Sequence, residues 1–302
     1  MTGKQKAAWI GLGKLGLPMA ARLAEEFSVT GFDLSEERLA LAETRGIKRA
    51  TDLASAVADA AVVFVSLPDD RALRAAVLAD GALLSHLSSG TILVETSTVS
   101  VHASQDVDRV AGEIGVSYLR APVSGNPVSA EAGTLSALVS GPEEAFKSVS
   151  PMLATFCQSQ SWLGDADQGR YAKLAINLMI AVSAGMMAEA LALARRGGID
   201  WHDMLNLMEH SAVGSPMVKY KCAPMHDRDF TSTFSGRQMA KDLDLILECT
   251  RASDVPAPLA AQMREMYTAM IAAGDGDDDY IATIRHQERL SGLADIEPSK
   301  TA

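Results

Sequence analysis

The sequence predicts an α/β domain with a doubly wound parallel sheet, followed by an all-α domain. Through the first half, short runs of apolar and β-branched residues alternate with helical patterns, which is typical of a parallel α/β sheet. After residue 165 the strand-like runs stop and helical patterns follow one another. We therefore expect one domain at residues 1–164 and a second at 165–302, which a long apolar interdomain helix opens.

Each expected element has its own local signal. Continuous or alternating apolar runs predict strands at 7–11, 28–33, 60–68, 91–96, 116–123, 135–141 and 159–164. The run at 60–68 is apolar almost throughout, as expected for a strand buried on both faces. Helical periodicity predicts helices at 14–25, 35–45 and 143–156, and then at 166–195, 200–211, 236–253, 257–273 and 279–290, with a loop at 228–236.

The composition argues against several classes of protein. The 302 residues carry a formal net charge of −11 and no run rich in lysine or arginine, so we expect no nucleic-acid partner. Three cysteines without a CxxC pair favour a reducing compartment, and the N-terminus does not resemble a signal peptide, so a cytoplasmic location is expected. Six histidines without metal-ligand spacing predict that there is no metal site.

The most apolar segment lies at residues 174–188. It is shorter than the ~20 residues that a membrane span needs, and Lys173 and Glu189 bracket it. A helix that is apolar on nearly all sides is typical of one buried between domains or subunits. We therefore expect no membrane segment, and a homodimer or homotetramer that covers this helix.

The stretch GLGKLG links the first expected strand to the first expected helix. It comprises Gly11, Leu12, Gly13, Lys14, Leu15 and Gly16, which form the pattern G-x-G-x-x-G. In this context the first glycine allows a tight turn, the second lets the backbone approach a pyrophosphate, and the third lets helix and strand pack closely. The start of the helix then offers N–H groups to the phosphates. A plain glycine turn is the alternative interpretation.

Asp33 ends the next expected strand, 22 residues after Gly11, and favours the dinucleotide interpretation. In a Rossmann-type domain, an acid at this place accepts hydrogen bonds from the adenosine ribose. The same carboxylate would repel a 2′-phosphate. The sequence therefore predicts NAD as the cofactor, with NADP as the alternative.

Lys173 and Asn177 interrupt the apolar helix expected at 166–195. Together with Gly169 they are spaced by four residues, so all three lie on one stripe of that helix. We expect Gly169 to leave a gap where a ligand reaches the backbone, with Lys173 pointing into it. Burial disfavours a charged ammonium, and an amine that can lose its proton is what alcohol oxidation requires. The alternatives are a snorkelling lysine and a hydrogen-bonded core amide.

The order of motifs resembles that of the β-hydroxyacid dehydrogenase family over residues 7–290. The blocks that carry the resemblance are GLGKLGLPMAARL (11–23), VSLP (65–68), ETST (95–98), APVSGNPVSAEAGTLSALVSG (121–141), GRYAKLAIN (169–177) and FSGRQMAKDLDL (234–245). The resemblance implies an oxidoreductase that transfers hydride between NAD(P) and the hydroxyl carbon of a small 3-hydroxyacid, or that reduces the matching semialdehyde.

The resemblance also implies roles for particular residues. Lys173 is expected to be the general acid and base, and Asn177 is expected to hold the lysine or the substrate oxygen in line. The residues expected to contact the cofactor beyond the glycine loop are Leu67, Pro68, Thr98 and Lys241. A small backbone nest formed by Ser124, Gly125 and Asn126 is expected to bind the anionic group of the substrate.

Departures from the family pattern leave the substrate open. Ile176 stands where many members have a second asparagine, Asn126 stands for a glycine, and Glu95 stands for an aspartate. The candidates are 3-hydroxyisobutyrate, tartronate semialdehyde, succinic semialdehyde, threonate and sulfonated analogues. An imine reductase-like enzyme and a non-catalytic dinucleotide-binding protein are the other interpretations. Relatives of those two kinds generally lack the lysine, so Lys173 speaks against both.

Overall fold

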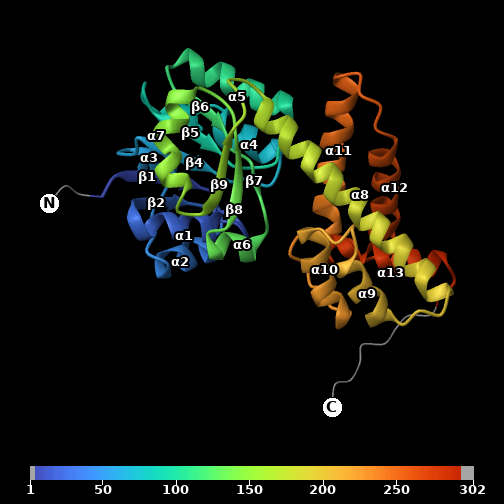
Figure 1. The fold of residues 1–302 in the computed structure, drawn as a ribbon. Helices are drawn as coiled ribbons and strands as arrows, with labels where there is room; N and C mark the ends of the chain where they lie inside the picture. The colour runs from blue at the N-terminus through green and yellow to red at the C-terminus, as the bar shows by residue number, and fades with distance from the viewer. Residues whose placement is uncertain (1–3, 294–302) are drawn as a thin grey trace. The chain divides into compact units, whose positions relative to one another are not determined.

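The computed structural model describes residues 4–293, and the chain divides into two compact units (Figure 1). The first unit ends at Lys173 and the second begins at Leu174. Both residues lie inside one helix, α8 (Gln168–Arg196), so the first turn of that helix belongs to the first unit. The change from strand-like to helical patterns lies earlier in the sequence, before α8 begins.

Six parallel strands form the main sheet of the first unit. They are β1 (Lys6–Ile10), β2 (Ser28–Phe32), β3 (Lys48–Arg49), β4 (Val62–Val65), β5 (Ile92–Glu95) and β6 (Ser117–Arg120), in the order β3-β2-β1-β4-β5-β6. The chain builds outward from β1 to β3 and then returns to the other side of β1 for β4. Doubly wound sheets bind ligands at such a reversal of strand order. The predicted fold class is confirmed.

Two hydrophobic cores cover the two faces of this sheet. The helices of this region are α1 (Gly16–Glu26), α2 (Glu36–Thr44), α3 (Leu53–Val57), α4 (Asp70–Val77), α5 (Val101–Glu113) and the short 3₁₀ helix η1 (Leu83–His86). Alternate strand residues point to opposite faces, so Trp9 and Phe64 lie in one core and Val63 and Val65 in the other. The rings of Trp9 and Phe64 stack with their centroids 4.9 Å apart. All of β4 is buried, as its continuous apolar run predicts.

The chain changes sheets within the segment 116–123, so the prediction of a single strand there is wrong. Ala121 N–H donates to Glu95 O at the main sheet (2.8 Å), whereas Pro122 O accepts from Leu138 N–H (3.0 Å). The second sheet comprises β7 (Val123–Ser124), β8 (Leu135–Val139) and β9 (Cys157–Trp162), in the order β7-β8-β9. Two helices connect its strands, α6 (Pro127–Ala132) and α7 (Glu143–Leu153). The added strands near 135 and 159, with a helix between them, confirm the prediction.

The second unit is helical, as predicted. Besides most of α8 it contains α9 (Trp201–His210), α10 (Pro216–His226), α11 (Gly236–Ala252), α12 (Pro258–Ala272), the 3₁₀ helix η2 (Tyr280–Ala282) and α13 (Thr283–Leu290). The sequence pattern did not predict α10, which contains Pro224 and mixes charged with apolar residues. The acidic turn before η2 ends in Asp279, whose carboxylate caps η2.

Helix α8 is long and apolar enough, by length and composition alone, to cross a membrane, and 44% of its most apolar window is buried within the chain. Three of its outward-facing residues, Met179, Met186 and Leu193, are large and apolar. They recur every seven residues, so they lie along one side of the helix. A single copy of the chain therefore leaves an apolar stripe uncovered on α8.

Candidate active site

The glycine loop turns tightly from β1 into α1. Gly11 has φ = 91°, which favours glycine, and a methyl group there would lie 2.2 Å from Ser66 O. A methyl group at Gly16 would lie 2.1 Å from Gly11 O. Both positions therefore need glycine so that α1, its loop and the end of β4 can meet. These are the roles that the sequence predicts for the first and third glycines.

The geometry of Gly13 and of the start of α1 fits a dinucleotide pyrophosphate. Gly13 faces open space, with no heavy atom within 4 Å of the position of a Cβ. The N-cap residue of α1 is Leu15, and no side chain caps the helix. Free N–H groups and the positive end of the helix dipole suit a bound phosphate. Of the remaining loop residues, Leu12 is buried and Lys14 is exposed.

Asp33 follows β2, and its carboxylate is hydrogen-bonded to the glycine loop. Its Oδ2 accepts from Leu12 N–H (2.6 Å) and its Oδ1 accepts from Ser35 N–H (2.8 Å). An ionised carboxylate has about four acceptor sites, so Asp33 keeps capacity for the hydroxyls of a ribose. The next residue, Leu34, is 94% exposed and gives no positive charge to attract a further phosphate.

The loops after β4 and β5, which contain the other expected cofactor residues, are tied together. Leu67 N–H donates to Ser97 Oγ (2.7 Å), and Thr96 Oγ donates to Val65 O (2.9 Å). Pro68 and Thr98 follow these contacts directly in the sequence. The structure thus brings the 65–68 and 95–98 segments side by side at the carboxyl edge of the sheet, as expected from adjacent parallel strands.

The expected substrate loop begins at the end of β7. Gly125 has φ = 137°, and a methyl group there would lie 2.5 Å from Leu135 Cδ2, so the position needs glycine. Asn126 is the N-cap of α6, since its Oδ1 accepts from Ser129 N–H (2.9 Å) and Pro127 follows it. The departure at Asn126 from a glycine therefore has a structural reason, because asparagine is among the best N-cap residues.

Lys173 and Asn177 are both buried on α8, at 8% and 5% exposure. Asn177 Nδ2 donates to Asp242 Oδ2 (2.6 Å), and the other oxygen of Asp242 pairs with Lys241 Nζ (2.9 Å). The second unit therefore groups Asn177 and Lys241 around one buried carboxylate. Asp242 is not among the residues predicted from the sequence, although its place among the apolar positions of α11 was a signal.

The gap predicted beside Gly169 is filled by protein atoms. A methyl group at Gly169 would lie 2.6 Å from Leu138 O and 3.0 Å from Ser140 Oγ. Gly169 N–H also donates to that hydroxyl (3.0 Å). The glycine lets the first turn of α8 pack directly on β8, which is a structural role rather than access for a ligand.

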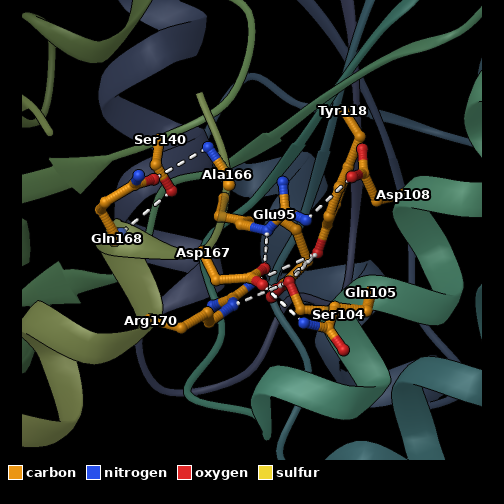
Figure 2. A network of polar contacts seen from close by, with 12 residues as sticks. Glu95, Ser104, Gln105, Asp108, Tyr118, Ser140, Ala166, Asp167, Gln168 and Arg170 are labelled. Atoms are coloured by element: carbon orange, nitrogen blue, oxygen red, sulfur yellow. Dashed lines mark hydrogen bonds and ion pairs between the residues drawn. The ribbon is translucent and has the colours of Figure 1, made fainter. Parts of the chain in front are cut away.

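A buried polar network that the sequence analysis did not predict surrounds this first turn. Figure 2 shows side chains of β5, α5, β6 and α8 pointing toward one another. At its centre, Glu95 and Arg170 form an ion pair. Both are almost fully buried, at 0% and 1% exposure. One local sign of this network is present in the sequence, the charged residue Glu95 at the end of the apolar run that forms β5.

Known proteins share both halves of this arrangement. A family described as the NAD binding domain of 6-phosphogluconate dehydrogenase matches residues 6–164. A second, described as NAD-binding of NADP-dependent 3-hydroxyisobutyrate dehydrogenase, matches residues 167–287. Hence residues 6–164 and 167–287 resemble known nicotinamide-dependent enzymes.

Similar individual proteins span nearly the whole chain. The 2-(hydroxymethyl)glutarate dehydrogenase of Eubacterium barkeri is 31% identical over 96% of this chain and 97% of its own length. The NAD-dependent L-serine dehydrogenase of Pseudomonas aeruginosa is 30% identical over 91% of this chain and 95% of its own length. The structure of Mycobacterium tuberculosis 3-hydroxyisobutyrate dehydrogenase with L-serine has a TM-score of 0.85 and 29% identity, and the match covers 94% of this chain and 99% of that one.

Gly169→Ala tests the packing of α8 on β8. We expect a loss of about 1–3 kcal/mol in the free energy of unfolding, because the added methyl group meets backbone and must displace the helix. Denaturant titration measures the change. The matched control is Gly112→Ala in α5, where nothing lies within 4 Å of the new methyl group. That variant should be neutral or more stable, and equal losses in both would contradict the packing role.

Proposed function

Because this chain belongs to the β-hydroxyacid dehydrogenase family, we propose that it oxidises the primary hydroxyl of a small 3-hydroxyacid, or reduces the matching semialdehyde. The hydride-transfer activity itself follows from the family, which comprises NAD(P)-dependent oxidoreductases.

The proposed general acid and base is Lys173. The observation that carries this role is an amine at 8% exposure on an apolar helix, one turn from the buried amide of Asn177. Oxidation of an alcohol needs a base for the hydroxyl proton, and reduction of the semialdehyde needs an acid that returns it. Bound NAD(P) would supply the hydride acceptor. Lys173 moves the proton in either direction.

Asn177 is proposed to orient Lys173 or the substrate oxygen. Its Nδ2 donates to Asp242, so its Oδ1, which lies in the same plane on the other side of Cγ, points away from that carboxylate. That oxygen is an acceptor, and an ammonium or a hydroxyl is the donor that it requires. Asp242 thereby selects the orientation of the amide, and it holds Lys241, the proposed cofactor contact, with its second oxygen.

The proposed substrate class is HOCH₂–CH(R)–COO⁻. The names of the similar enzymes specify 2-(hydroxymethyl)glutarate, L-serine and 3-hydroxyisobutyrate, and all three compounds contain this unit with different R groups. The backbone of Ser124 and Gly125, with the Ser124 hydroxyl, is proposed to bind the carboxylate. Asn126 can contribute its backbone and Nδ2, since its Oδ1 caps α6.

NAD is the proposed cofactor in preference to NADP. The carboxylate of Asp33 stands at the end of β2, where it faces a ribose in this fold, and it would repel a 2′-phosphate. The glycine loop, Leu67, Pro68 and Thr98 are proposed to hold the rest of the dinucleotide. These residues lie at the carboxyl edges of β1, β4 and β5.

A homodimer or homotetramer in the cytoplasm is the proposed assembly. The stripe of Met179, Met186 and Leu193 is 69%, 46% and 74% exposed in one chain, which favours a second copy as its cover. Cys157 and Cys222 are buried free thiols, which is consistent with a reducing compartment.

Lys173→Ala tests the proton-transfer role. We expect turnover of short 3-hydroxyacids with NAD to fall by about 10²–10⁴-fold, since the general base is lost. NADH affinity, measured by fluorescence titration, should stay near that of the parent protein. The control is Lys219→Ala, which removes an exposed lysine of α10. Unchanged turnover in Lys173→Ala would show that another group moves the proton.

Asp33→Asn tests the cofactor preference. The amide keeps an acceptor for the glycine loop but removes the charge, so the NADP-to-NAD ratio of kcat/KM should rise about 10-fold, or 1.4 kcal/mol. Steady-state kinetics with both cofactors measure the ratio. Glu43→Gln, at the far end of α2, makes the same change in charge on an exposed residue. An equal rise in that control would assign the effect to net charge alone.

The double substitution Met186→Asp and Leu193→Asp tests the apolar stripe as an interface. Charges on the stripe should dissociate the assembly, and light scattering after gel filtration should then report a smaller mass than for the parent. Leu41→Asp, at an exposed apolar position of α2, is the control and should keep the parental mass. A parent protein that is monomeric at micromolar concentration would overturn the proposed assembly.

A further inference from the structure

We propose that Glu95 and Arg170 are a pair of positioning residues that lock the first turn of α8 to the loops after β4 and β5, and so set the place of Lys173. The inference rests on the proposed function, because it assumes that Lys173 moves the proton. Both members of the pair and Lys173 belong to the first unit. Neither Glu95 nor Arg170 is proposed to contact the substrate or the cofactor.

The pair holds the backbone of Ser97 from both sides. Glu95 Oε1 accepts from Ser97 N–H (2.5 Å), and Arg170 Nη1 donates to Ser97 O (2.7 Å). The ion pair between Arg170 Nη2 and Glu95 Oε2 closes this clamp. Ser97 precedes Thr98, a proposed cofactor contact, so the clamp determines the path of the chain into that residue.

Through Ser97 the clamp also reaches the loop after β4. The hydroxyl of Ser97 accepts from Leu67 N–H (2.7 Å). Three segments therefore share one network, namely the loop with Leu67, the loop with Thr98 and the first turn of α8. All three contain residues to which the proposed function assigns cofactor binding or proton transfer. A shift of the pair would move them relative to one another.

The rest of the Arg170 guanidinium is also occupied. Its Nε donates to Ser104 Oγ (3.1 Å) and its Nη2 donates to the Tyr118 hydroxyl (3.2 Å). The Tyr118 hydroxyl in turn donates to Glu95 Oε2 (3.4 Å). Four contacts in fixed directions suit the planar fork of arginine and cannot be reproduced by a lysine. Burial lowers the pKa of Arg170 to about 9, so at neutral pH the guanidinium stays charged.

A second ion pair fixes the start of the helix. Arg120 Nε, at the end of β6, pairs with Asp167 Oδ1 (2.8 Å), and Gln105 Nε2 donates to Asp167 Oδ2 (2.7 Å). Asp167 O accepts from Arg170 N–H (2.9 Å), so the carboxylate sits directly before the first turn. Arg170 and Lys173 are three residues apart and neighbours on the helix surface. A fixed position for Arg170 therefore also fixes the position of Lys173.

The physical consequence of this pair is geometry more than stability. Removing one partner of a buried ion pair is costly because it leaves an uncompensated charge, whereas removing both charges together avoids that cost. A substitution that neutralises both partners together should therefore leave a folded protein. Its altered property should be the alignment of the residues that the pair connects.

The test is the double variant Glu95→Gln and Arg170→Gln, assayed with NAD and a 3-hydroxyacid that the parent oxidises. We expect kcat to fall about 100-fold, the cost of a misplacement of about 1 Å, with KM and NADH affinity within about threefold of the parent. The pH midpoint of kcat/KM should also shift, because the surroundings of Lys173 change. The number of active sites is counted by NADH titration, so that loss of folded protein does not imitate a fall in kcat.

The matched control is the double variant Glu288→Gln and Arg228→Gln in the second unit. That pair is also buried: Arg228 Nη2 lies 2.7 Å from Glu288 Oε2, and Glu288 Oε1 also pairs with Arg195 Nη1 (2.5 Å). This variant should lower the melting temperature, because Arg195 loses that ion pair, without changing kcat or the pH profile. If the Glu95 and Arg170 variant behaves like this control, the pair is merely structural and the proposal is overturned.

Two further variants keep the proposal decisive. If the double variant does not fold, Glu95→Asp retains the charge but withdraws the carboxylate from Ser97. It should show the same shift of the pH midpoint with a smaller fall in kcat, and an unchanged profile overturns the proposal. Lys173→Ala separates the two hypotheses. Loss of turnover there, with normal kcat in the double variant, rejects only the positioning role, whereas retained turnover rejects the proton-transfer role itself.

Discussion

The anchoring of the first turn of α8 at the carboxyl edge of the main sheet is the constraint on which the candidate site depends. Arg170 contacts Glu95 at the end of β5 and Tyr118 within β6. Gly169 permits this approach, because any side chain there would meet Leu138 O. An α-helix rises only about 1.5 Å per residue, so a fixed first turn also fixes Lys173.

The same constraint explains why charged groups are buried here. A buried carboxylate or guanidinium without a partner costs about 3–5 kcal/mol, so each charge must find its counterpart in the folded state. Glu95 pairs with Arg170 at the first turn of α8, and Asp167 pairs with Arg120 just before that turn. Burial raises the pKa of Tyr118 far above its ordinary value, which keeps its hydroxyl available as a donor within this network.

Helix α8 distributes the proposed chemistry over two units. Lys173, at the start of the helix, belongs to the unit that contains the glycine loop, Asp33 and the loops after β4 and β5. Asn177, one turn later, belongs to the second unit, where the carboxylate of Asp242 orients its amide. Proton transfer and amide orientation thus depend on the continuity of a single helix, although each residue takes its support from a different unit.

The sequence by itself determined the features that have a local cause. Apolar periodicity predicted the α/β half and the helical half, and the glycine loop and Asp33 predicted the dinucleotide fold. Only the tertiary structure decided that 116–123 divides between two sheets, that Gly169 meets β8, and that Asp242 and Arg170 find their partners. The physical reason is that a buried charge is stable only beside its partner, and these partners are distant in the sequence. Asn177 and Asp242 are about 65 residues apart in the chain, and Glu95 and Arg170 are about 75 residues apart.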